Sequence, residues 1–279
     1  MVLAGDPVFE DAWGPLVAVR ARERMRVPRG TGDLDRALLD LERLADARRR
    51  IGATASTGIA AVLSYEAGTR VGSERPGPDV PDLIAWEVDA AIDWSDGLPR
   101  GVAIDGRGVD LEAIVRLATG SEAARSDGLR CRPTTSLPRD AYLDAVGRIR
   151  SRIVAGDIYQ ANLTQTFCVE HSDDPFETFA RLVNATPAPR AAFVDAGDVA
   201  LASVSPEVFV DVDSTGRAET RPIKGTRARA ETAAADAAAA AALLASPKDR
   251  AELLMIVDLE RNDLGRVCRT GTVEVPDPA

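Results

Sequence analysis

Two stretches in the second half of the sequence decide the fold: SPEVFVDVDSTGRAETRPIKGTRAR at residues 205–229 and SPKDRAELLMIVDLERNDLGR at residues 246–266. The first stretch contains short apolar runs separated by turn-forming residues, which is typical of antiparallel strands. The second stretch begins with Ser246, a good helix cap, and Pro247, which suits the first turn of a helix. We therefore predict a hairpin of strands and then a helix over 247–261, whose dense apolar residues predict packing on most of its sides.

Lys224 lies in the first stretch, within the segment Arg-Pro-Ile-Lys-Gly-Thr. Pro222 has no backbone N–H to donate, so we expect the segment to start at the end or the edge of a strand. Gly225 lets the backbone approach a ligand closely, and the next amide and the Thr226 hydroxyl could donate hydrogen bonds to an anion. A lysine amine attacks carbon only when it is neutral, so a nucleophilic Lys224 needs a lowered pKa. The same residues also fit a basic loop that faces the solvent.

Asp249 and Glu252 stand three residues apart in the predicted helix, so both carboxylates lie on one helix face. Such a pair could bind a single divalent cation, and oxygen ligands favour Mg²⁺, with waters and a substrate anion completing the coordination shell. Acidic residues in a first helical turn are also favoured by the helix dipole without any metal. The spacing is compatible with both interpretations.

The motifs SPEVF, PIKGT and SPKDRAELLMIVDLERNDLGR, with GDIYQANLTQTF at residues 156–167, resemble those of the chorismate-utilising enzymes. That family includes anthranilate synthase component I, aminodeoxychorismate synthase component I, and the isochorismate and salicylate synthases. The resemblance covers the sequence well from Asp140 onward and only weakly before it. It implies an α+β fold like that of anthranilate synthase component I, with mixed and antiparallel sheets covered by helices. It also implies a variable N-terminal region at 1–125, a linker at 126–137 and the N-terminal part of a chorismate-binding domain at 138–279.

The resemblance also implies a role for individual residues. Aminodeoxychorismate synthases have a lysine before Gly-Thr where anthranilate and isochorismate synthases have alanine, so Lys224 would attack ring carbon 2 of chorismate and displace the 4-hydroxyl. Glu207, in Ser-Pro-Glu, would be the general acid and base. Gln160 stands where the water-adding members have a lysine base, and an amide cannot deprotonate water, which argues against isochorismate synthase. Gly225 and Thr226 would bind a substrate carboxylate.

A metal and a partner follow from the same resemblance. Glu252 matches a Mg²⁺ ligand, and Asp249, where the family more often has glutamate, would reach the metal through a water. The implied reaction is chorismate plus ammonia to 4-amino-4-deoxychorismate, on the p-aminobenzoate and folate branch, with ammonia from a separate glutamine amidotransferase.

A further family segment, with a catalytic histidine, a carboxylate-binding arginine and two more metal glutamates, has no counterpart in the sequence. We therefore expect a fold that is truncated at its C-terminal end. Two alternatives are anthranilate synthase component I and a truncated, non-catalytic subunit that binds chorismate or a partner protein.

Composition excludes several other classes of function. A net charge of −10 disfavours binding to nucleic acid or to an anionic membrane surface. The sequence contains no apolar run of membrane-spanning length, and we expect no signal peptide at its start. The three cysteines, Cys131, Cys168 and Cys268, are isolated, so a disulfide scaffold or a structural zinc site is not expected and a reducing cytoplasm fits. His171 is the single histidine, which rules out a His-rich metal site.

Hydrophobic periodicity predicts the remaining elements. The predicted strands cover 16–22, 58–66 (a buried strand), 83–88, 102–104, 158–169, 191–195, 199–203 and 208–212, with a further strand at Lys224. In the strand at 158–169, Gln160 would lie on a polar face, and such a face commonly faces the solvent. The family resemblance implies instead that this face forms the wall of a cavity. The predicted helices cover 31–50, 111–117, 138–155, 176–183 and 231–244. Gly156 is expected to end the third of these helices.

Overall fold

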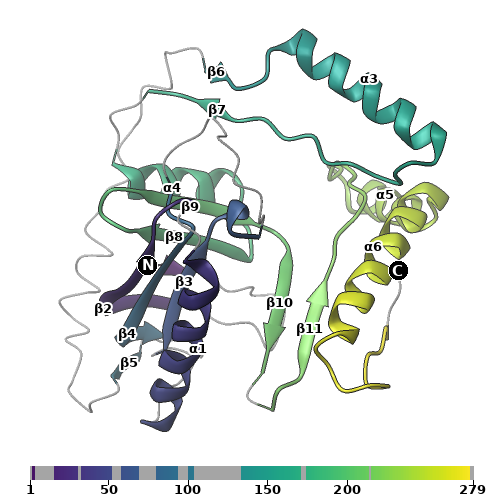
Figure 1. Cartoon of the computed structure of the whole chain (residues 1–279). Coiled ribbons are helices and arrows are strands. Elements are labelled where there is room, and N and C mark those ends of the chain that lie inside the picture. Colours follow the sequence, from purple (N-terminus) through teal and green to yellow (C-terminus); the bar gives the residue numbers. More distant parts are fainter. Residues whose placement is uncertain are drawn as a thin grey trace. The chain divides into compact units, whose positions relative to one another are not determined.

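The computed structural model describes residues 2–3, 16–30, 33–51, 58–68, 80–93, 100–103, 133–170, 174–213 and 215–276. The chain divides into two compact units, Met1–Val204 and Ser205–Ala279 (Figure 1). Helices and antiparallel strand pairs make up the described part, which confirms the predicted α+β class. The predicted linker at 126–137 stays a prediction, and most of it lies outside the described residues.

A seven-stranded sheet forms the centre of the first unit (Figure 1). Its strands are β1 (Val2–Leu3), β2 (Leu16–Val27), β3 (Ile59–Leu63), β4 (Leu83–Asp93), β5 (Arg100–Ala103), β8 (Arg190–Asp195) and β9 (Ala200–Ser205). The strand order is β3-β4-β2-β1-β8-β9, and β5 pairs with β4 on the same edge as β3. The predicted strands at 16–22, 83–88, 102–104, 191–195 and 199–203 are therefore confirmed, several of them as longer strands.

Strand β4 is a buried interior strand of this sheet, between β2 on one side and β3 and β5 on the other. It pairs with β2 along its whole length, from Val27↔Leu83 to Leu16↔Asp93. Leu83 and Ala91 have no exposed surface, and Ile84 is only 2% exposed. The strand lacks the strict alternation of apolar and polar residues that marks a strand with one exposed face, which is consistent with its burial.

Helix α1 (Leu34–Arg50) packs against the sheet at the start of β4. The hydrophobic cluster between them contains Val27, Ala37 and Leu83, with Met25, Leu34 and Leu41 packed against it. At the other end of the helix, the buried Arg48 side chain donates hydrogen bonds to Asp89 Oδ1 at 2.7 Å and to the Val88 carbonyl at 2.7 Å. These bonds fasten α1 to β4, and the predicted helix at 31–50 is confirmed from residue 34 onward.

Helix α4 (Pro175–Ala185) covers another part of the sheet, at β8 and β9. The Asp174 carboxylate caps the helix by accepting hydrogen bonds from the Phe176 and Glu177 amides at 2.8 and 3.2 Å. A hydrophobic cluster joins Phe179 to Ala191 and Phe193, with Val183 and Val204 packed against it. This arrangement confirms the helix predicted at 176–183.

Helix α3 (Arg139–Ala155) is confirmed, and Gly156 ends it with a left-handed φ of 80°. The strand predicted at 158–169 is wrong, because only β7 (Phe167–Cys168) is a strand there, paired with β6 (Thr134–Thr135) over two residues. The alternation of polar and apolar residues was the basis for that prediction, but a strand also needs a neighbouring backbone to bond with. The described residues provide such a neighbour only for β7.

The buried strand predicted at 58–66 is also partly wrong. Strand β3 covers Ile59–Leu63, and a short 3-10 helix, η1 (Tyr65–Gly68), follows it. As the end strand of the sheet order it is half-exposed, and Leu63 is 50% exposed. The helix predicted at 111–117, and the residues His171 and Cys131, lie outside the described residues.

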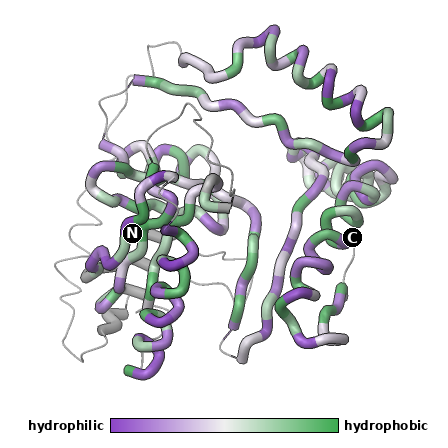
Figure 2. The backbone as a smooth tube through the Cα atoms, in the orientation of Figure 1, coloured by the Kyte–Doolittle hydropathy of each residue, from purple (hydrophilic) through white to green (hydrophobic). Residues whose placement is uncertain are grey.

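The second unit contains an antiparallel pair, β10 (Val208–Val212) and β11 (Ala218–Arg221), followed by α5 (Ala233–Leu244) and α6 (Pro247–Gly265). Thr232 and Ser246 cap the two helices through their side-chain oxygens. These elements confirm the strand predicted at 208–212 and the helices predicted at 231–244 and 247–261. Figure 2 shows β10 as a mostly hydrophobic strand.

Two predictions for the second unit are wrong. Strand β11 ends at Arg221, directly before Pro222, so Lys224 does not lie in a strand. Helix α6 was expected to be packed on most of its sides, but none of its residues is buried by the described part of the chain, and Leu254 and Leu259 are exposed. Apolar composition indicates only a tendency toward burial, and burial itself depends on which neighbours cover the helix.

None of the helices in the described part of the chain combines the length and the hydrophobicity needed to cross a bilayer.

Candidate functional site

The register of the β10–β11 pair brings Glu207 to the residues around Lys224. Val208 pairs with Arg221, so the flanking residues, Glu207 and Pro222, face one another beyond the end of the ladder. There the Glu207 Oε1 atom accepts a hydrogen bond from the backbone N–H of Ile223 at 2.8 Å. The carboxylate is therefore held beside the residue that precedes Lys224.

Lys224 lies in an irregular segment at residues 222–230, here called the lysine loop. Pro222 begins the loop directly after β11, where a residue without an N–H cannot continue the strand ladder. Lys224 itself is half-buried. Among the ion pairs within the described residues, none involves the amine of Lys224.

Gly225 fixes how the lysine loop packs on the helices of its unit. Its φ is +78°, a left-handed conformation that residues with a side chain rarely adopt. A Cβ atom at this position would lie 2.7 Å from Leu243 Cδ1 and 3.1 Å from Asp249 Cβ. The loop backbone therefore contacts the end of α5 and the start of α6 directly, and only glycine fits. Thr226 follows it on the exposed side of the loop.

Asp249 lies in the first turn of α6 and is paired with the lysine loop. The Arg227 Nη2 atom is 2.9 Å from Asp249 Oδ2, and the side chain of Asp249 is only 12% exposed. The Asp249 backbone N–H also donates to the Ser246 hydroxyl that caps the helix. Hydrogen bonding with the Ser246 side chain, and then with the Arg227 guanidinium, holds the pKa of Asp249 below its ordinary value.

Glu252 lies one turn farther along the same helix face. Its Oε1 atom is 3.0 Å from the Nζ atom of Lys248, and the hydrogen bond to Glu252 raises the pKa of Lys248. The two carboxylates that share the face thus contact two different cations. The described residues contain no group of three or more His, Cys, Asp and Glu side chains able to hold a metal. Asp249 and Glu252 fit Mg²⁺ only in its usual partial form, in which waters and a substrate anion complete the coordination shell.

Six of the seven candidate residues lie in the second unit, in the bend before β10, in the lysine loop and in α6: Glu207, Lys224, Gly225, Thr226, Asp249 and Glu252. The seventh, Gln160, lies in the first unit, in the irregular segment before β7, where its side chain is exposed. The sequence pattern suggested that Gln160 lies on the polar face of a strand, but in the structure Gln160 does not belong to a strand.

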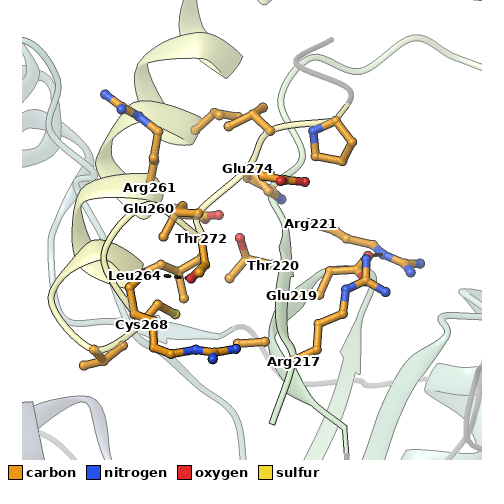
Figure 3. A pocket seen from close by; sticks show the side chains of 18 of the residues that line it. Arg217, Glu219, Thr220, Arg221, Glu260, Arg261, Leu264, Cys268, Thr272 and Glu274 are labelled. Atoms are coloured by element: carbon orange, nitrogen blue, oxygen red, sulfur yellow. Dashed lines mark hydrogen bonds and ion pairs between the residues drawn. The ribbon is translucent and has the colours of Figure 1, made fainter. Parts of the chain in front are cut away.

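A cavity of about 890 Å³ in the second unit was not predicted from the sequence. It lies between β11 with its preceding turn, the second half of α6, and the segment at 267–276. Figure 3 shows Arg217, Glu219 and Arg221 on one side and Glu260 and Leu264 on the other. None of the seven candidate residues lines it. Its lining comes from three separate segments, so no local motif signals it.

Known proteins resemble the chain over most of its length. Residues 12–279 match the pattern of the family described as chorismate binding enzyme. Aminodeoxychorismate synthase component 1 from Salmonella typhimurium is 39% identical over 170 residues, which cover 60% of this chain and 37% of that protein. Anthranilate synthase component 1 from Spirochaeta aurantia is 44% identical over 140 residues, covering 50% of this chain and 29% of that protein. Aminodeoxychorismate synthase from Streptomyces griseus is 46% identical over 140 residues, covering 50% and 19%.

The crystal structure of anthranilate synthase component I from Streptococcus pneumoniae TIGR4 has a similar fold. It superposes with a TM-score of 0.66 at 22% sequence identity, covering 94% of this chain and 63% of that chain. This likeness confirms the predicted fold. The chain spans between 19% and 37% of the length of the three curated relatives above. Because the family pattern extends over residues 12–279, the chain belongs to the family of chorismate binding enzymes.

Proposed function

We propose that this chain carries the nucleophile and the acid–base residue of an aminodeoxychorismate synthase of the component I type, which converts chorismate and ammonia to 4-amino-4-deoxychorismate. The observation that carries this proposal is the hydrogen bond from the Ile223 N–H to Glu207 Oε1. It joins the carboxylate to the loop at the residue before Lys224, as an acid–base group and a nucleophile acting on one substrate require. Relatives named as aminodeoxychorismate synthases support the reaction.

The reaction balances in two steps. The neutral amine of Lys224 forms a bond to ring carbon 2 of chorismate while the two ring double bonds shift, and the 4-hydroxyl leaves as water with a proton from Glu207. Ammonia then forms a bond to carbon 4, the double bonds shift back, the lysine leaves as a neutral amine, and the new ammonium group returns a proton to Glu207. One ammonia is consumed and one water is produced for each chorismate, and the enzyme returns to its starting state.

The remaining candidate residues would bind the substrate. The backbone amides at Gly225 and Thr226 would hold a carboxylate of chorismate, and Gln160 would contact the substrate without activating a water. Mg²⁺, bound directly by Glu252 and reached by Asp249 only through a water, would supply positive charge for a second carboxylate. A glutamine amidotransferase would supply the ammonia, and the product, 4-amino-4-deoxychorismate, would lie on the p-aminobenzoate and folate branch.

The main alternative is an anthranilate synthase component I, since a relative of that name is 44% identical over half of the chain. Lys224 favours the aminodeoxychorismate product, because the resemblance gives anthranilate synthases an alanine at this position. A second alternative is a subunit that binds chorismate or a partner without turnover. The two alternatives differ from the proposal in the product formed.

The product assay decides among these functions. The purified chain is incubated with chorismate, Mg²⁺ and an ammonium salt, and the products are identified by chromatography with mass detection. We expect 4-amino-4-deoxychorismate, and none in a control without ammonium. Anthranilate as the product would contradict the proposal in favour of the first alternative. Binding of chorismate in calorimetry without any product would favour the second.

A further inference from the structure

We propose that Arg227 and Asp249 form a clamp that positions Lys224, so that Asp249 acts as a positioning residue and leaves the direct contact with Mg²⁺ to Glu252. The proposal rests on the proposed function in that it treats Lys224 as the nucleophile. The clamp itself is a property of the folded chain and is testable without substrate or metal.

The first observation is the ion pair that joins the lysine loop to helix α6. Arg227 lies three residues after Lys224, and its Nη2 atom is 2.9 Å from Asp249 Oδ2. The Asp249 side chain is 12% exposed, against 42% for Arg227. A hydrogen bond between charged groups is stronger than a neutral one, and a carboxylate shielded from water depends on its partner. The Asp249 carboxylate is therefore bound to the lysine loop through its Oδ2 atom.

The second observation is the close packing at Gly225. A Cβ atom built there would lie 3.1 Å from both Cβ and Cγ of Asp249, so the loop backbone rests directly on the side chain that pairs with Arg227. On the other side of Lys224, the Ile223 N–H donates to Glu207 at 2.8 Å. Lys224 is thus the one residue between two anchored points, and its backbone position depends on both.

The third observation is that the two acids of α6, Asp249 and Glu252, differ in exposure and in the cationic side chain that each contacts. Glu252 is 41% exposed and pairs with Lys248, whose side chain is 76% exposed, in an i,i+4 pair on the helix surface. Exposed pairs of this kind are weak, so a divalent cation can replace Lys248. Asp249 is less exposed, at 12%, and contacts both Arg227 and the loop backbone at Gly225. The geometry therefore gives the metal contact to Glu252 and the loop contact to Asp249.

Proteolysis at lysine tests the clamp directly, because the chain contains only two lysines, Lys224 and Lys248. A lysine-specific endoprotease is added to the intact chain in EDTA, and cleavage after Lys224 is followed by mass spectrometry. Asp249→Asn and Arg227→Gln should each raise that cleavage rate about fivefold, as expected for loss of a contact of this strength. The double variant should cleave no faster than either single variant, because both substitutions remove the same contact.

Arg229→Gln is the matched control, since Arg229 lies in the same loop and pairs with Asp236 at 2.8 Å. Cleavage after Lys224 should stay within about twofold of the wild-type rate there. Circular dichroism of each variant shows whether the whole chain remains folded. The clamp proposal would be overturned if a folded Asp249→Asn variant were cleaved after Lys224 at the wild-type rate. It would also be overturned if Arg229→Gln raised that rate as much as Asp249→Asn does.

A second readout distinguishes positioning from metal binding in the product assay. Asp249→Asn should lower kcat while the Mg²⁺ concentration that gives half the maximal rate stays unchanged. Glu252→Gln should raise that Mg²⁺ concentration at least about tenfold. The reverse assignment, with Asp249→Asn shifting the Mg²⁺ requirement as strongly as Glu252→Gln, would contradict the proposal. Absence of product from the wild-type chain would count against the proposed function alone, because the proteolysis result does not depend on it.

Discussion

Replacing Lys224 with alanine is expected to lower the rate of 4-amino-4-deoxychorismate formation at least about a thousandfold, as removal of a covalent nucleophile does in other enzymes. Alanine cannot form the bond to ring carbon 2, so the two-step route is closed. Glu207 keeps its hydrogen bond to the Ile223 N–H, because that bond uses only the backbone of the loop. Any remaining turnover is then expected to resemble that of an anthranilate synthase. The measurement is the product assay with mass detection.

Lys248→Arg is the matched control for this prediction, since Lys248 is the other lysine of the chain. The hydrogen bond to Glu252 raises its pKa, so Lys248 stays charged and cannot act as a nucleophile. Arginine preserves the positive charge beside Glu252, and the rate should be nearly unchanged. An undiminished rate in Lys224→Ala would refute the nucleophile assignment.

Replacing Gly225 with alanine is expected to destabilise the second unit for two separate reasons. The left-handed φ of +78° costs a residue with a Cβ about 1–2 kcal/mol. The added Cβ would also lie 2.7 Å from Leu243 Cδ1 and 3.1 Å from Asp249 Cβ, and overpacking of this kind costs about a further 1–3 kcal/mol. Urea unfolding followed by circular dichroism measures the sum, and the product assay should show a parallel loss because the loop moves off α6.

Gly216→Ala separates the two contributions. Gly216 also has a positive φ, of +85°, but nothing lies within 4 Å of a Cβ placed there. It should therefore show only the conformational cost, about 1–2 kcal/mol. Equal destabilisation by the two substitutions would mean that the lysine loop does not pack against Asp249 in solution.

Local signals in the sequence predicted the helix that carries the two acids and the strand end at Pro222, although the strand predicted at Lys224 was wrong. Ser246 and Pro247 mark the start of α6, and the serine side chain does cap the helix. Pro222 marks the end of β11 because proline cannot continue a strand ladder. Both features depend on residues adjacent in the chain, so neither required knowledge of the fold.

Features that depend on distant neighbours were not predictable in the same way. The alternation at 158–169 suggested a strand, but only Phe167 and Cys168 have a partner strand. The apolar run of α6 suggested burial, yet Leu254 remains 45% exposed. In both cases the sequence pattern is compatible with the predicted structure, but strand pairing and burial depend on which other segments lie beside it.

The contacts within the candidate site also depend on the folded arrangement. Glu207 meets Ile223 through the register of two strands, and Arg227 meets Asp249 across 22 positions of sequence. The spacing of Asp249 and Glu252 indicated a shared helix face, but it gave no sign that each acid pairs with a different cation. Side-chain pairs of this kind follow from the tertiary packing of a loop on a helix.

The most direct test of the account is whether chorismate becomes attached to Lys224. The chain is incubated with chorismate and Mg²⁺ in the absence of ammonia, quenched, and analysed by intact mass and peptide mapping. The account predicts a mass increase equal to chorismate less one water, located on the peptide that contains Lys224 and lost when ammonium is added before the quench. An unmodified Lys224 in a preparation that forms 4-amino-4-deoxychorismate once ammonium is present would contradict it.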